Sequence, residues 1–172
     1  MNQENIRPLT ESEVALLKKT FRGMDGNRLA MRFYTSLFTR YPHLRSLFPT
    51  DLTELANKIV SVFELVVFSF QQHPDGTYHL QKEVLLPLRS LGSLHEERGV
   101  SDAHYPLVNE ILLESIRLES PGFSLAAERA WKLALNHLTF AMIDKRAGDT
   151  RPDHMTIAES YQHIRSLLFR VE

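Results

Sequence analysis

Residues 84–95 read VLLPLRSLGSLH and end in a histidine. Four residues of this stretch recur at spacings of four, three and four and therefore share one face of a helix: Val84, Leu88, Leu91 and His95. A neutral imidazole that faces an apolar space is a side chain that a metal ion takes as an axial ligand. A single histidine on such a face is more often a hydrogen-bonded core residue than a ligand, so the rest of the chain has to decide between the two.

Most of the chain is predicted to be helical. Apolar residues recur at helical spacing, and the alternation that is typical of strands is scarce. Thr10 and Glu13 form a capping-box pair at the start of the first helix, and Leu9 and Val14 have the spacing of a hydrophobic staple. Including this first one, helical segments are expected over about 10–21, 27–40, 42–48, 51–72, 101–119, 124–146 and 153–171. One more helix carries His95 and ends at Gly99.

Proline and glycine mark the breaks between these segments. The sequence HPDG at 73–76 ends the long fourth segment, and Pro87 is expected in the first turn of the helix that carries His95. His73 and His79 in the intervening loop could attract a metal ion, but Asp75 is the only carboxylate at a suitable spacing, so such a site is disfavoured. About eight helices of unequal length, without a heptad seam, indicate an all-α fold with angled helix crossings.

Composition excludes several classes of function. A chain of 172 residues with 43% hydrophobic content fits one globular domain. The net charge of −1 gives no field that would favour nucleic acid or an acidic membrane. The absence of cysteine excludes disulfides, thiolate zinc sites and cysteine nucleophiles. Because no secretory signal or membrane-spanning run is visible, a cytoplasmic protein is expected.

Four motifs occur in order along the chain. They are F-Y-x-x-L-F-x-x-Y-P-x-L-x-x-L-F at 33–48, L-G-x-x-H at 91–95, Y-P-L-V at 105–108, and Trp131 three residues before Ala134. Together they resemble the bacterial single-domain and flavohaemoglobin-like branch of the globins, over roughly residues 10–147. One motif alone would be weak, but their order reverses the balance for His95 and favours a ligand.

The resemblance implies a globin fold of the 3-on-3 type with about seven to eight helices. Residues 1–9 would be a lead-in, 10–147 the globin domain, and 148–172 an extension with an extra C-terminal helix. It also implies haem b as the cofactor, with His95 as the proximal iron ligand. Leu91 and Val100 would contribute to the lining of the haem site.

On the distal side, the resemblance assigns Phe48 to the aromatic that wedges against the haem, and Tyr34 to a hydrogen-bond donor for the bound gas. A core tyrosine whose hydroxyl is satisfied by a backbone carbonyl is the alternative for Tyr34. Leu55 would stand at the ligand gate, where a histidine or glutamine is usual, and Ile59 over the iron. A register shifted by three residues would place Lys58 at the gate and Val62 over the iron.

Lys58 could interact with a bound haem in two ways. It could lie at the rim of the pocket and pair with a haem propionate. It could also be a sixth iron ligand, which requires the neutral amine and therefore a pKa far below about 10.4.

The proximal side bears on catalysis. In the flavohaemoglobin-like branch the proximal histidine is hydrogen-bonded to a tyrosine and a glutamate, a network that favours oxidative chemistry. Tyr105 matches the tyrosine. Arg146 occupies the position of the glutamate, and Asp144 is the nearest acid, so the network lacks its acid. The chain also has no glycine fingerprint of a reductase.

A haem protein that reversibly binds a diatomic gas is therefore the function we expect, with oxygen foremost and nitric oxide or carbon monoxide as other ligands. A sensor that signals through the helix at 153–171 is one alternative. Nitric oxide dioxygenase-like or peroxidase-like activity with an external reductase is another, and a haem-free partner-binding domain is disfavoured. The chain could act as a monomer or a homodimer.

Overall fold

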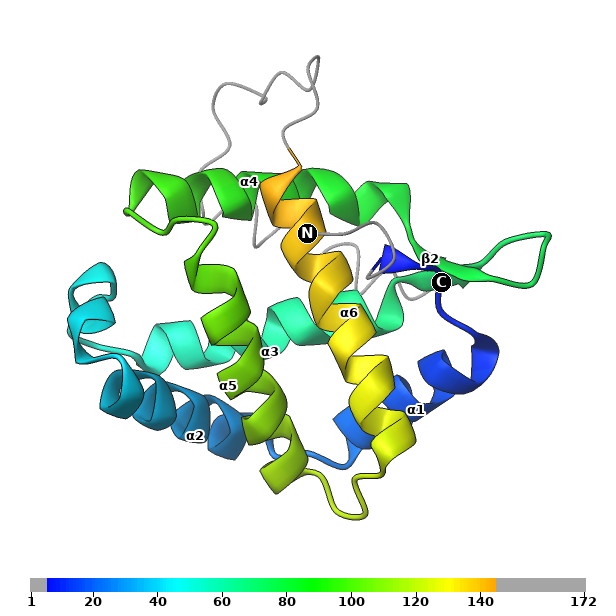
Figure 1. Ribbon diagram of the computed structural model, residues 1–172, viewed down its shortest axis with the longest axis horizontal. Coiled ribbons are helices and arrows are strands. Elements are labelled where there is room, and N and C mark those ends of the chain that lie inside the picture. The colour runs from blue at the N-terminus through cyan, green and yellow to red at the C-terminus, as the bar shows by residue number, and fades with distance from the viewer. Residues whose placement is uncertain (1–5, 145–172) are drawn as a thin grey trace.

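Helices account for most of residues 6–144, the part of the chain that the computed structural model describes (Figure 1). The helices are α1 (Glu11–Arg22), α2 (Gly26–Arg40), the 3-10 helix η2 (Pro42–Leu47), α3 (Thr53–Phe68), α4 (Lys82–Glu97), α5 (His104–Glu119) and α6 (Leu125–Ile143). A hairpin of β1 (Phe70–Gln72) and β2 (Tyr78–Leu80) joins α3 to α4. The predicted all-α fold is confirmed, whereas the helix expected over 153–171 lies outside the described residues.

The helices cross one another at an angle around a single core. In Figure 1, α5 and α6 pass in front of α3, and α4 runs along one edge of the molecule. Direct packing joins α4 to α6, α1 to α6, α2 to α5 and α2 to α3. No helix within residues 6–144 is both long and apolar enough to cross a membrane.

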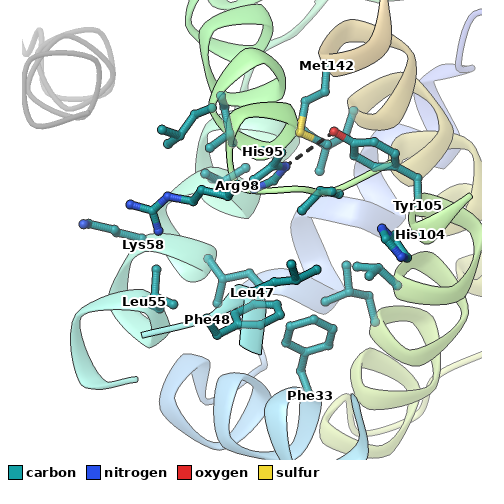
Figure 2. A pocket seen from close by; sticks show the side chains of 18 of the residues that line it. Phe33, Leu47, Phe48, Leu55, Lys58, His95, Arg98, His104, Tyr105 and Met142 are labelled. Atoms are coloured by element: carbon teal, nitrogen blue, oxygen red, sulfur yellow. Dashed lines mark hydrogen bonds between the residues drawn. The ribbon is translucent and has the colours of Figure 1, made fainter. Parts of the chain in front are cut away.

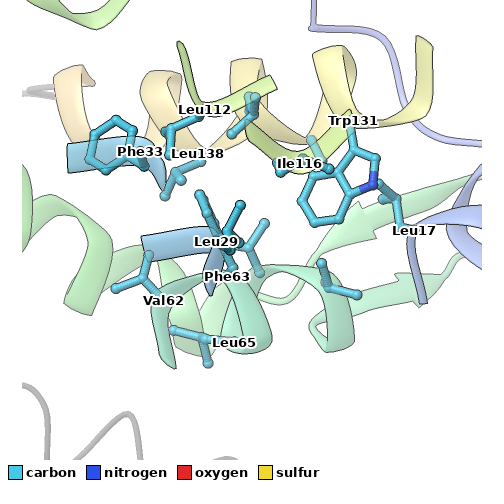
Figure 3. Packing of buried hydrophobic residues seen from close by; sticks show 14 of the residues in the cluster. Leu17, Leu29, Phe33, Val62, Phe63, Leu65, Leu112, Ile116, Trp131 and Leu138 are labelled. Carbon is cyan, nitrogen blue, oxygen red and sulfur yellow. The ribbon is translucent and has the colours of Figure 1, made fainter. Parts of the chain in front are cut away.

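Trp131 on α6 is the largest side chain of the core. Its ring meets that of Phe63 on α3 edge to face, with centroids 6.1 Å apart, and both side chains are almost fully buried (Figure 3). The indole Nε1 donates a hydrogen bond to Thr20 Oγ1 on α1 at 2.8 Å, which satisfies the polar atom that burial would otherwise strand. This contact fixes α6 against α1 and α3.

The start of α1 follows the predicted capping chemistry. The Thr10 hydroxyl accepts the Glu13 N–H, and the Glu13 carboxylate accepts the Thr10 N–H at 2.9 Å. Leu9 and Val14 are both buried. Arg7 adds an ion pair to the Glu13 carboxylate at 2.5 Å. The capping box and the ion pair together stabilise the negative charge of Glu13.

A first prediction concerns this carboxylate. The hydrogen bond from Arg7 is the largest of the effects that lower the pKa of Glu13 from 4.5 to about 2. The charged form therefore stabilises the folded chain above pH 4.5, and this stability is lost as the pH falls toward 2. We expect Glu13→Gln to lower the free energy of unfolding by about 1 kcal/mol at pH 7 and by less at pH 3. Urea unfolding at the two pH values measures the difference; an equal loss at both would contradict it.

The segment after α3 differs from the expected helix. We predicted helix to residue 72, but α3 ends at Phe68 and Phe70–Gln72 pairs with Tyr78–Leu80. Gly76, with φ of 81°, forms the turn between them. Leu9 extends the pairing, because its N–H donates to the Tyr78 carbonyl at 3.0 Å and its carbonyl accepts the Tyr78 N–H at 2.8 Å. Pairing with a distant segment of the chain therefore outweighs the local helical pattern.

Two further helix boundaries differ from the prediction. Pro87 was expected in the first turn, but α4 begins at Lys82 and Pro87 lies inside the helix. A proline there leaves the carbonyl four residues earlier without its helical donor, and the burial of Val84 and Pro87 offsets that loss. The helix expected to reach residue 146 ends at Ile143, where the Asp144 backbone is extended and its N–H donates to the Phe140 carbonyl.

Candidate functional site

A predominantly apolar cavity lies among α2, α3, α4, α5 and α6 and the corner after η2 (Figure 2). It encloses about 1240 Å³ of space not filled by atoms, including its open mouth. It is lined by all nine residues expected at the haem site: Tyr34, Phe48, Leu55, Lys58, Ile59, Leu91, His95, Val100 and Tyr105.

His95 projects into this cavity from the last turn of α4 (Figure 2). Burial, assisted by the charge of Arg98, lowers its pKa from 6.5 to about 4, so the imidazole is neutral at physiological pH. Its Nδ1 lies 3.5 Å from the Tyr105 hydroxyl. When Nδ1 donates to that hydroxyl, Nε2 carries the lone pair that a metal ion requires.

Gly92 allows α4 to approach α6 closely, one helical turn before His95. A Cβ atom at residue 92 would lie 2.0 Å from the carbonyl oxygen of Met142 and 2.8 Å from its Cα. No real Cβ atom could occupy that position without moving the backbone of one helix. The glycine in the L-G-x-x-H motif therefore sets the depth at which α4 presents His95.

On the side of the cavity that carries His95, Tyr105 contacts the histidine, but within residues 6–144 no acidic side chain is hydrogen-bonded to Tyr105. Asp144, the acid nearest in sequence to the expected position, forms an ion pair with Arg89 on α4 at 3.5 Å. Met142 lines the cavity, on the same side as His95 and Tyr105 in Figure 2. Arg146, at the position where the resemblance would place a glutamate, lies outside the described residues.

Tyr34 lies on the opposite side of the cavity, on α2. Its hydroxyl donates to the backbone carbonyl of Leu55 at 3.4 Å, which is long for a bond whose usual length is about 2.7–2.8 Å. Burial raises the pKa of Tyr34 to about 12, so the hydroxyl keeps its proton. The contact with a backbone carbonyl that is expected of a core tyrosine is therefore present, with a long distance between donor and acceptor.

The structure brings the residues of both expected distal registers to the cavity. Leu55, Lys58, Ile59 and Val62 all line it, because they follow one another at helical spacing on α3. Lys58 forms an ion pair with Glu54 one turn earlier on the same helix. Its amine therefore lies at the rim of the cavity as a cation.

Two basic side chains lie at the mouth of the cavity. Lys58 and Arg98 extend in the same direction at one side of the cavity in Figure 2, beyond the apolar interior. His104 also lines the cavity, but its Nδ1 accepts the Ser101 N–H at 2.9 Å. That bond ties the His104 side chain to the loop before α5 and occupies Nδ1. His95 is therefore the better candidate for a metal ligand.

Several residues that line the cavity were not predicted from the sequence. Helical spacing from predicted residues would have found some of them, because Leu94 and Arg98 flank His95 on α4 and its C-terminal end. Others come from helices that reach the cavity only through tertiary packing, and they form pairs four residues apart on α5 and α6: Val108 with Leu112, and Leu138 with Met142.

Arg45 on η2 holds the corner that carries Phe48. Its guanidinium donates to three successive backbone carbonyls, those of Phe48 at 3.1 Å, Pro49 at 2.8 Å and Thr50 at 3.0 Å. It also lies over the ring of Phe38, 5.1 Å from the centroid, and that ring meets Phe48 edge to face at 5.2 Å. Arg45 thus positions Phe48 at the cavity wall.

A second prediction follows for this arginine. Arg45→Met keeps an unbranched apolar stem but removes all three hydrogen bonds, and we expect the free energy of unfolding to fall by about 2 kcal/mol. Hydrogen exchange at residues 46–50 should become faster. Arg40→Met is the matched control, since Arg40 forms exposed ion pairs with Glu110 and Glu114 that are worth under about 1 kcal/mol. Equal losses in the two variants would show that Arg45 does not hold the corner.

The residues present fit a flat, largely apolar group that carries a metal and an acidic edge. One neutral imidazole is directed into an apolar interior, and cations lie at the mouth, where carboxylates would meet them. Within residues 6–144 no group of three or more histidine, cysteine or acidic side chains could hold a metal ion directly. A haem, which brings its own nitrogen ligands to the iron, matches this arrangement better than a bare metal ion.

Comparison with known proteins gives the class. A model of the globin family matches residues 31–142, and the chain therefore belongs to the globin family.

Individual relatives span several kinds of globin. A leghemoglobin of Psophocarpus tetragonolobus is 29% identical over 144 residues, which cover 77% of this chain and 94% of the relative. A globin-like protein of Aquifex aeolicus is also 29% identical, with 83% and 92% covered. A flavohemoprotein of Vibrio cholerae is 26% identical and matches 80% of this chain but only 34% of its own length. A solved bacterial globin from Campylobacter jejuni has the same fold, with a TM-score of 0.65 at 19% identity and coverage of 78% and 94%.

Proposed function

We propose that this globin binds haem b in the cavity, with His95 as the iron ligand, and that it reversibly binds a diatomic gas, oxygen foremost, in the cytoplasm. The observation that carries the proposal is the imidazole of His95, which burial keeps neutral, at an apolar cavity lined by side chains from five helices. The names of the leghemoglobin and flavohemoprotein relatives support haem as the cofactor. The haem iron supplies the position at which the gas binds.

The chain's own residues divide the remaining work. Tyr105 orients the His95 ring through Nδ1. Phe48 and Ile59 line the interior as apolar side chains and exclude water from it. Lys58 and Arg98 pair with the haem carboxylates at the mouth. We assign Lys58 to this role in preference to a sixth ligand, because its amine is engaged in an ion pair with Glu54.

Gas binding is favoured over oxidative catalysis by the proximal side. Asp144 forms an ion pair with Arg89. Within residues 6–144 no acidic side chain is hydrogen-bonded to Tyr105. A nitric oxide dioxygenase-like activity with an external reductase is the second candidate, favoured by the contact between Tyr105 and His95. The matched region covers 34% of the length of the flavohemoprotein, and turnover of nitric oxide would require electrons from such a reductase.

Absorption spectra of the haem-loaded protein test the proposal. The reduced protein should change its spectrum on addition of oxygen or carbon monoxide, and should return to the starting spectrum when the gas is removed. Rapid oxidation of the iron by oxygen, without a reversible oxygenated spectrum, would contradict oxygen binding as the function. Turnover of nitric oxide with an added reductase would then favour the second candidate.

A third prediction concerns Tyr34. Tyr34→Phe removes the distal hydroxyl while the ring remains, so we expect oxygen to be released roughly fivefold faster, the equivalent of about 1 kcal/mol for one hydrogen bond. Stopped-flow measurement of the release rate provides the test, and carbon monoxide release should change less, because that ligand is less polar. Tyr41→Phe is the control, since Tyr41 lies outside the cavity lining. An unchanged oxygen release rate in Tyr34→Phe would assign Tyr34 to packing alone.

A further inference from the structure

The hairpin between α3 and α4 brings two histidines together away from the haem cavity. None of its residues lines that cavity, and in Figure 1 the hairpin projects from the side of the molecule. His79 pairs with Gln71, and the His73 N–H donates to the Thr77 carbonyl at 2.8 Å. This register makes His73 and His79 diagonal neighbours on one face of the hairpin. Their ring centroids are 4.4 Å apart.

A hydrogen-bond chain fixes which nitrogen of His79 is available. The Thr77 hydroxyl donates to Asp75 Oδ1 at 2.6 Å and lies 3.0 Å from His79 Nε2. Because a hydroxyl has one proton and Asp75 accepts it, the Thr77 oxygen must accept a proton from Nε2. The neutral ring therefore carries its lone pair on Nδ1. The carboxylate of Asp75, kept ionised by its bonds to Thr77, which lower its pKa, adds negative charge beside both rings.

The separation of the rings matches that of two ligands on one metal ion. A metal bound at about 2.0–2.1 Å from an imidazole nitrogen lies about 3.2 Å from the ring centroid. Two such rings at right angles around the metal have centroids about 4.5 Å apart, close to the 4.4 Å between His73 and His79. The sequence spacing of six residues matches no helical metal motif, so only the hairpin register brings these ligands together.

We propose that His73 and His79 bind one divalent transition-metal ion that favours imidazole and places ligands at right angles, such as Cu²⁺ or Ni²⁺. Within residues 6–144 no third protein ligand completes a cluster, so water fills the remaining positions and the affinity is moderate. The ion links the two strands that connect α3, on the distal side, to α4, which carries His95. Binding to the folded hairpin stabilises the fold by linkage.

Titration of the full haem-loaded chain with Ni²⁺ alone, followed by calorimetry, tests the site. We expect His73→Gln and His79→Gln each to weaken Ni²⁺ binding by roughly tenfold or more, on the scale of a lost metal-site partner. His43→Gln is the matched control, because His43 is an exposed histidine on η2, and it should leave the affinity unchanged. Ni²⁺ should also raise the melting temperature of the wild type more than that of either hairpin variant.

The haem absorption band separates this site from the haem site, since Ni²⁺ bound at the hairpin should leave the band unchanged. If His79→Gln fails to fold, His73→Gln decides, because His73 is exposed. Unchanged Ni²⁺ affinity in His73→Gln, or an equal loss in His43→Gln, would overturn the proposal.

Discussion

Replacing His95 with glycine is expected to weaken haem binding by more than the roughly 10–100-fold that the loss of an outer-sphere partner costs. The substitution removes the neutral imidazole that the structure directs into the cavity and leaves the apolar walls in place. It also leaves a space of the size of the lost ring beside Tyr105. Added imidazole should therefore enter that space and restore both the affinity and the absorption spectrum of the wild type.

His104 offers a matched control for this substitution. It is a second histidine in the cavity lining, but its Nδ1 accepts a backbone hydrogen bond from Ser101. We expect His104→Gln to bind haem with the spectrum of the wild type. If His104→Gln lost the spectrum while His95→Gly retained it, the assignment of the proximal ligand would be wrong.

The second large effect is expected at Gly92. In Gly92→Ala the new Cβ would lie 2.0 Å from the Met142 carbonyl oxygen, and because the obstacle is backbone, no side-chain rotation can relieve it. We expect a loss of about 3 kcal/mol or more in the free energy of unfolding, which for a chain of this size lowers the melting temperature by on the order of 10 °C. The separation of α4 and α6 should also displace His95, so haem should dissociate faster from the folded variant.

Gly23→Ala is the control for Gly92→Ala. Gly23 ends α1 with φ of −85°, and the nearest atoms to an added Cβ there are 3.6 Å away, so alanine fits. Thermal unfolding of the two variants, followed by circular dichroism, makes the comparison. Equal melting temperatures would contradict the close contact of α4 with α6.

Helical spacing predicts that His95 and Leu91 share one face, whereas the role of His95 and the place of Tyr105 beside it came from the resemblance to globins. His95 shares a helical face with Leu91, and Tyr105 follows at the start of the next helix, so short-range geometry brings them to one cavity. The distal register could not be chosen in this way. Leu55, Lys58 and Ile59 are all close enough on α3 to reach the same space, so sequence periodicity gives no preference among them.

Features that depend on distant pairing were beyond the sequence pattern. The strand Phe70–Gln72 has three residues, too few for a recognisable alternation, and it forms because it pairs with Tyr78–Leu80 and because Leu9 pairs with Tyr78. Pro87 suggested a helix start through its local preference, but α4 begins at Lys82 and buries Val84 before the proline. In both places tertiary packing decides the outcome.

Titration of the haem-free protein with haem, followed by absorption in the Soret region, tests the central claim most directly. A haem bound in the cavity through His95 should give a sharp band that grows linearly and stops at one haem per chain. A weak, broad absorption that increases without saturation, in a protein that remains folded by circular dichroism, would contradict the claim that this cavity is a haem site.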